Sequence, residues 1–150
     1  MSTAKHLKES NLQPLRKRQF LFCIKNYIPT ILLSSLLGTY LDLLFVGKHL
    51  YFFPIRPFPS VFSINILFTL VGLPMLMVIY LFLMQKWRNW AKAILVIFIS
   101  LGMTVIERMA EEFGFFVHTN YWSHLYSFVG YCLFLLIVYT FHMWLKKKMV

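Results

Sequence analysis

Four long apolar segments constrain this chain more than any other feature of its sequence. They cover approximately residues 26–46, 61–84, 91–113 and 125–145. A helix needs about 20 apolar residues to cross the ~30 Å hydrocarbon core of a bilayer, because each residue adds about 1.5 Å. The chain has 150 residues and is 59% hydrophobic, which is too apolar for one soluble core. We therefore predict an all-α, membrane-embedded four-helix bundle.

The basic residues flank these apolar segments. Twelve of the 15 lysines and arginines lie in residues 1–25, in a hairpin at residues 85–92 and in the tail at residues 146–150. The positive-inside rule then predicts that both termini are cytoplasmic and that the protein is a multi-pass component of the cell membrane. Residues 1–25 are too long for the basic region of a signal peptide, and no A-x-A-like site follows. We therefore expect that the first apolar segment is not cleaved and remains the first span of a transmembrane domain covering residues 26–145.

Several classes of protein are not expected from the composition. The formal charge of +10 could indicate nucleic-acid binding, but there is no nucleic-acid-binding motif and no interleaved basic and aromatic patch. Cys23 and Cys132 have no CxxC spacing, and we expect no disulfide between them. We expect neither a nucleic-acid partner nor a cofactor. The expected partners are the lipid bilayer and either another membrane protein or a second copy of this chain.

Charged residues near the ends of the apolar segments indicate a candidate site. A charge near the bilayer centre costs roughly 2.5–3.5 kcal/mol on insertion scales, so it needs a partner or a function. Asp42 and Glu107 each lie about 17 residues past the expected cytoplasmic boundary, which places both ~25 Å across the membrane. Polar residues of the other two segments reach the same level. We predict an outward-opening polar pocket lined by Asp42, Asn65, Glu107, Arg108, Glu111 and Ser127.

Two loops are expected to cover this pocket. Residues 47–60 contain three prolines, which forbid a regular helix and stiffen the backbone around Arg56. Arg56 has two interpretations: it contacts lipid phosphate, or it belongs to a lid and pairs with the acids of the pocket. His118 and His124, in the second outer loop and at the start of the fourth segment, complete the candidate lid.

The charged residues also have a purely structural interpretation. Asp42, Arg56, Glu107 and Arg108 could pair only to hold the bundle together. If the cluster is functional, we expect a non-enzymatic membrane component of accessory or binding type. The alternative is a small proton- or cation-coupled transporter, which would act as an oligomer because four spans seldom enclose a pathway alone.

Metal binding and catalysis are weaker hypotheses. A metal site formed by Glu107, Glu111, His118 and His124 is conceivable, but their spacing matches no known ligand motif, so we expect no metal. Glu107 and Glu111 could act as a paired acid and base. No nucleophile motif accompanies them, so we do not expect an enzyme.

Several short motifs between residues 28 and 140 carry a resemblance to a known family. They are Tyr40-Leu-Asp-Leu, Phe53-Pro-Ile-Arg-Pro-Phe-Pro, Phe62-Ser-Ile-Asn-Ile-Leu-Phe-Thr-Leu, Ile106-Glu-Arg-Met-Ala-Glu, Phe115-Phe-Val-His and Trp122-Ser-His-Leu-Tyr-Ser-Phe-Val-Gly-Tyr. In these motifs the chain resembles a family of small, uncharacterised multi-span membrane proteins of Bacillus-like Gram-positive bacteria. The resemblance implies a membrane location and the predicted topology, and it implies no reaction.

Overall fold

The computed structural model describes residues 12–119 and 122–148, with side chains from residue 26 onward. Apart from one two-stranded ladder, the regular structure in these residues is helical. Four of the helices are long and apolar enough to cross a membrane, which confirms the predicted all-helical, four-segment organisation. They are Asn26–Gly47, Phe68–Lys86, Asn89–Glu112 and His124–Lys148.

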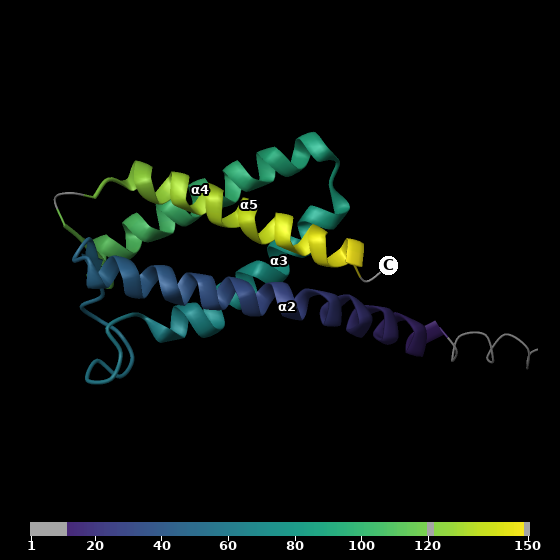
Figure 1. Ribbon diagram of the computed structural model, residues 1–150, viewed down its shortest axis with the longest axis horizontal. Helices are drawn as coiled ribbons and strands as arrows, with labels where there is room; N and C mark the ends of the chain where they lie inside the picture. The colour runs from purple at the N-terminus through teal and green to yellow at the C-terminus, as the bar shows by residue number, and fades with distance from the viewer. Residues whose placement is uncertain (1–11, 120–121, 149–150) are drawn as a thin grey trace, which may run out of the picture.

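The helices pack lengthwise against one another (Figure 1). The first is α2 (Leu12–Gly47), and a π-helical turn, η1 (Phe68–Gly72), leads directly into α3 (Leu73–Lys86). They are followed by α4 (Asn89–Glu112) and α5 (His124–Lys148). Helix α5 packs against α4 and α2, and α2 also packs against α3. The loops after α2 and α4 lie together at one end of the bundle, which we call the loop end (Figure 1).

Large apolar side chains cover the outward faces of these helices. Leu36, Phe98 and Leu125, for example, are all largely exposed. Water-soluble monomers rarely expose apolar surface on this scale, whereas a lipid bilayer covers it. The four apolar helices therefore indicate a multi-pass membrane protein.

The first span, Asn26–Gly47, agrees with the predicted residues 26–46, but the second does not begin where predicted. Helix α2 itself extends back to Leu12, so Pro29 lies inside the helix. The second segment was predicted from residue 61, but helical structure begins only at Ile66. The backbone before it is held in the loop: Val61 donates to the carbonyl of Phe58, and Arg56 Nε donates to the carbonyl of Phe62 at 2.7 Å.

The π-helical turn η1 ends at Gly72, two residues before Pro74. Proline has no N–H group, and its ring clashes with the carbonyl four residues earlier in a regular α-helix. A π-helical turn widens the backbone locally, so it accommodates this proline without ending the helix. The second span therefore stays continuous through a residue that would otherwise break it.

The main core takes residues from all four long helices, and most of its fully buried side chains belong to α3. Met77, Tyr80 and Leu81 of α3 are fully buried and form one cluster with Leu135 and Val138 of α5. The Tyr80 hydroxyl donates to the carbonyl of Leu135 at 3.0 Å, which satisfies its polar atom within the apolar interior. This cluster fixes α5 relative to α3.

A short antiparallel ladder joins the two loops at the loop end. Strand β1 (Tyr51–Phe52) pairs with β2 (Val117–His118), so that Tyr51 lies opposite His118. Thr119 extends the contact by donating its N–H to the carbonyl of Leu50 at 3.0 Å. The ladder therefore places His118 next to the end of α2, although the two are far apart in the sequence.

Gly38 of α2 faces Leu73, and a Cβ atom built on this glycine would lie 2.5 Å from Leu73 Cδ2. We predict that Gly38→Val lowers the free energy of unfolding by about 1–3 kcal/mol, because the larger side chain overpacks the contact between α2 and α3. Gly102→Val is the matched control, since Gly102 of α4 has no such neighbour. Thermal unfolding in detergent measures both; equal losses would contradict this packing.

Candidate functional site

The centre of the site is the carboxylate of Glu107, near the end of α4. The residue is only 8% exposed, although it carries a charge. Two hydroxyl groups of α5 donate to it: Ser127 Oγ to Oε1 at 2.6 Å and Tyr131 to Oε2 at 2.5 Å. Ser127 and Tyr131 are four residues apart, so they lie on the same face of α5. The contact between α4 and α5 therefore holds this carboxylate in place.

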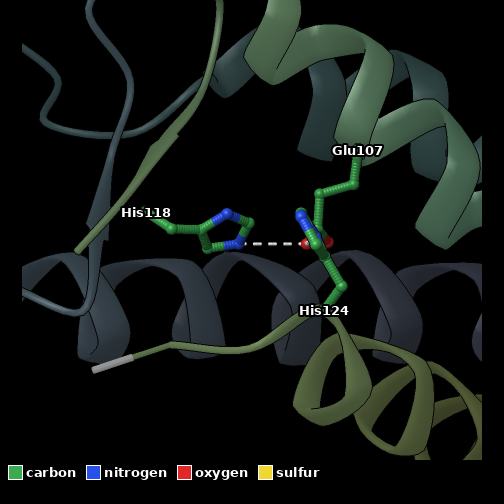
Figure 2. Close-up of side chains that lie close together, drawn as sticks. All are labelled: Glu107, His118 and His124. Atoms are coloured by element: carbon green, nitrogen blue, oxygen red, sulfur yellow. Dashed lines mark ion pairs between the residues drawn. The ribbon is translucent and has the colours of Figure 1, made fainter. Parts of the chain in front are cut away.

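Two histidines approach the same carboxylate from the loop end (Figure 2). His118 of β2 places Nε2 3.0 Å from Glu107 Oε1, and His124 at the start of α5 places Nδ1 3.6 Å from the same oxygen. Glu107 and His118 point toward one another from α4 and β2 (Figure 2).

Glu111, one turn after Glu107 on α4, contacts the other nitrogen of each histidine. Its Oε2 lies 3.3 Å from His118 Nδ1 and 3.6 Å from His124 Nε2. Its Oε1 accepts the backbone N–H of His118 at 3.1 Å. We call Glu107, Glu111, His118 and His124 the acid–histidine cluster.

Asp42 of α2 lies beside this cluster. The Tyr51 hydroxyl donates to Asp42 Oδ1 at 2.6 Å, and Asp42 is close enough to Glu107 for their charges to interact. Burial raises the pKa of the Tyr51 phenol far above its ordinary value, and the charge of Asp42 adds to this shift, so Tyr51 remains a neutral donor. Trp122 donates from Nε1 to Ser127 Oγ at 2.8 Å, which fixes the hydroxyl that contacts Glu107.

Among the side chains that the structure describes, the ion-pair partners of the two glutamates are histidines. Within residues 26–119 and 122–148, neither Glu107 nor Glu111 forms an ion pair with lysine or arginine. Burial lowers the pKa of the His118 imidazole, but its hydrogen bonds to Glu107 and Glu111 and their negative charges outweigh burial and raise that pKa above its ordinary value. The cluster thus favours a positive charge between the carboxylates.

The structure brings together four of the six residues predicted to line the pocket. These are Asp42, Glu107, Glu111 and Ser127. It also places His118 and His124 of the predicted lid directly on the acids. These histidines are therefore part of the cluster itself, and they do more than cover it.

The other three predicted residues do not join the cluster. Asn65 Oδ1 accepts the backbone N–H of Phe68 at 3.3 Å, so this side chain caps its own helix. Arg108 lies on the exposed side of α4, because it follows Glu107 by one position and points about 100° away from it. Of the two interpretations of Arg56, pairing with the acids is not what the structure shows: its guanidinium donates to the carbonyls of Phe53, Phe62 and Pro59.

Sequence reasoning missed Tyr51, Trp122 and Tyr131. The spacing of Tyr131 from Ser127 could have identified it, because the two share a helix face. Tyr51 and Trp122 act from loops, and their contacts depend on the ladder between β1 and β2.

A second polar group lies at the opposite end of the bundle and was not predicted. His142 of α5 is 3% exposed. Its Nδ1 lies 3.1 Å from Thr30 Oγ1 and its Nε2 lies 3.4 Å from Gln85 Nε2. This histidine links α2, α3 and α5.

Comparisons with family models, with curated proteins and with solved structures find no match to this chain. The family resemblance of its motifs therefore stays a prediction. The chemistry must be inferred from the groups themselves: carboxylates and imidazoles can exchange protons or bind a cation. Glu107, His118 and His124 could hold a metal ion, since their ligand atoms lie within 4.8 Å of one another.

We predict that Tyr131→Phe lowers the free energy of unfolding by about 1–3 kcal/mol, because the buried Glu107 carboxylate loses a donor that water cannot replace. Tyr126→Phe is the control: Tyr126 lies on the same helix but is exposed. It should change stability by less than about 0.5 kcal/mol. Thermal unfolding in detergent compares the two, and equal effects would show that the Tyr131 hydroxyl does not support Glu107.

Proposed function

We propose that this chain is an integral component of the cell membrane, of non-enzymatic accessory or binding type, that binds a ligand through its acid–histidine cluster. The observation that carries this proposal is the buried Glu107 carboxylate, which four side chains from α5 and β2 approach. A buried charge is costly near hydrocarbon, so such an arrangement is typical of a functional site.

The side of the membrane follows from the distribution of positive charge. Lysines and arginines are concentrated in the N-terminal segment, in the turn between α3 and α4 and at the end of α5. The start of α2, the turn between α3 and α4 and the end of α5 lie away from the loop end (Figure 1). With both termini cytoplasmic, the acid–histidine cluster lies at the outer membrane surface. The side chain of His124 is 39% exposed, which gives a ligand access from the aqueous phase.

The cluster offers no arrangement for nucleophilic catalysis. The Ser127 hydroxyl donates a hydrogen bond to Glu107, as a nucleophile would to its base. However, the same oxygen accepts a hydrogen bond from Trp122 Nε1, which blocks its approach to a substrate. Binding is therefore favoured over an enzymatic reaction.

A proton- or cation-coupled transporter is the second candidate. It is supported by buried polar groups along the bundle: the acid–histidine cluster at one end, His142 at the other, and Ser100 between them. The Ser100 hydroxyl is buried and makes no hydrogen bond to another residue in the described part of the chain. A pathway would need several copies of the chain, because four helices seldom enclose one.

The binding function predicts an outward-facing cluster, which thiol labelling can test. Both native cysteines are replaced by alanine, and either Ser123→Cys or Arg88→Cys is introduced; both positions are exposed, at opposite ends of the bundle. A membrane-impermeant maleimide should label Ser123→Cys in intact cells and Arg88→Cys only after permeabilisation. The reverse pattern would overturn the proposed orientation.

Liposomes containing the pure protein distinguish the two candidate functions. The binding function predicts no movement of protons or cations above that of empty liposomes when a pH or ion gradient is imposed. Flux that is abolished by Glu107→Gln but kept by Glu112→Gln would instead establish transport, because Glu112 is an exposed acid outside the cluster.

A further inference from the structure

We infer that the ligand of the acid–histidine cluster is a divalent transition-metal ion of the zinc class, bound by Glu107, His118 and His124. This assignment rests on the proposed function, since it names the ligand of the same cluster. It also reverses the expectation from sequence that no metal is bound, which depended on a residue spacing that matches no known ligand motif.

The three ligand atoms are close to the separations that a metal ion requires. A tetrahedral zinc ion with bonds of about 2.0–2.1 Å holds its ligand atoms about 3.3 Å apart. In the structure, Glu107 Oε1 lies 3.0 Å from His118 Nε2 and 3.6 Å from His124 Nδ1. All three atoms lie within 4.8 Å of one another. A modest rotation of the partly exposed His124 side chain would close the remaining gap.

The nitrogens that face this point are buried, and both lie against the Glu107 carboxylate. The His118 side chain is only 7% exposed, and its Nε2 atom lies 3.0 Å from Glu107 Oε1. His124 Nδ1 is buried as well and lies 3.6 Å from the same oxygen. Two ring nitrogens and one carboxylate oxygen therefore converge on one point, and these are the atoms with which histidine and glutamate bind zinc.

Glu111 supplies the contact that usually supports a metal-bound histidine. Such a histidine donates its second ring N–H to a carboxylate or carbonyl, which fixes the ring and leaves the first nitrogen free for the metal. Glu111 Oε2 lies 3.3 Å from His118 Nδ1, on the side of the ring away from Glu107. Tyr131 and Ser127 orient the Glu107 carboxylate in the same way.

Charge balance also favours a cation at this point. Glu107, Glu111 and Asp42 place three carboxylates at one end of the bundle, and Arg56 of the first loop donates to backbone carbonyls instead. A divalent ion would offset most of this negative charge. Two histidines and one glutamate are one of the ligand sets with which zinc keeps an open position for water or a further ligand.

Zinc titration of the purified full-length protein tests the site directly. The protein carries no polyhistidine tag, is stripped with a chelator and is titrated with ZnCl2 in detergent. We expect one Zn²⁺ per chain with a dissociation constant on the order of 1 µM or below. Co²⁺ should also bind and give the intense visible absorption of a tetrahedral site. Failure of the folded wild-type protein to bind either ion would overturn the assignment.

Variants locate the bound ion. Glu107→Gln, His118→Ala and His124→Ala should each weaken zinc binding at least roughly 100-fold, and Glu111→Ala about 10–100-fold. Two variants serve as matched controls and should bind as the wild type does. His49→Asn removes an exposed histidine at the loop end. The backbone of His49 has a positive φ, which asparagine also tolerates. Glu112→Ala removes the exposed acid next to Glu111.

Two readouts keep the result independent of folding. Size-exclusion chromatography establishes that each variant is folded, and zinc should raise the thermal midpoint of the wild type and of both controls but not that of the ligand variants. Unchanged zinc affinity in folded His118→Ala and His124→Ala would overturn the site.

The metal assignment and the proposed function can fail separately. Outward labelling of Ser123→Cys without zinc binding would leave an outer binding site whose ligand is not a metal. Zinc binding without outward labelling would keep the metal site and overturn its proposed side of the membrane.

Discussion

The arrangement of the loop end depends on one buried charge. Glu107 lies among apolar helices, where a carboxylate without partners would be strongly unfavourable. Ser127 and Tyr131 come from α5, and His118 comes from β2, so each partner of this carboxylate also ties α4 to another part of the chain. The polar contacts that satisfy the charge and the packing that holds the helices together are therefore the same interactions.

The ladder between β1 and β2 explains how the loops serve this site. The prolines of the first loop prevent a helix, and the short extended segment that remains pairs with the segment after α4. Tyr51, Phe53 and Phe116 pack together around this ladder. These aromatic side chains cover one side of the acid–histidine cluster. Arg56 stabilises the first loop by donating to the carbonyls of Phe53 and Phe62.

The two ends of the bundle differ in chemistry. The loop end gathers carboxylates and histidines with no lysine or arginine paired to them among the side chains described. The opposite end has the lysines and arginines of the α3–α4 turn and of the end of α5, and a hydrogen-bonded network around His142. This asymmetry supports the proposed orientation. It also supports the proposal that the cluster binds a cation.

The sequence alone determined the four apolar helices, because hydrophobic length and flanking charge are local properties of the chain. It also placed Asp42, Glu107, Glu111 and Ser127 at a common level, since rise per residue converts sequence position into depth. Helical spacing could not reveal the roles of His118 and Tyr51, which depend on pairing between two loops 67 residues apart. Nor could it separate Glu107 from Arg108 and Asn65, because all three are polar and lie near the same depth. Only the tertiary structure decided which of them face the bundle, because the rotation of each helix is set by its neighbours.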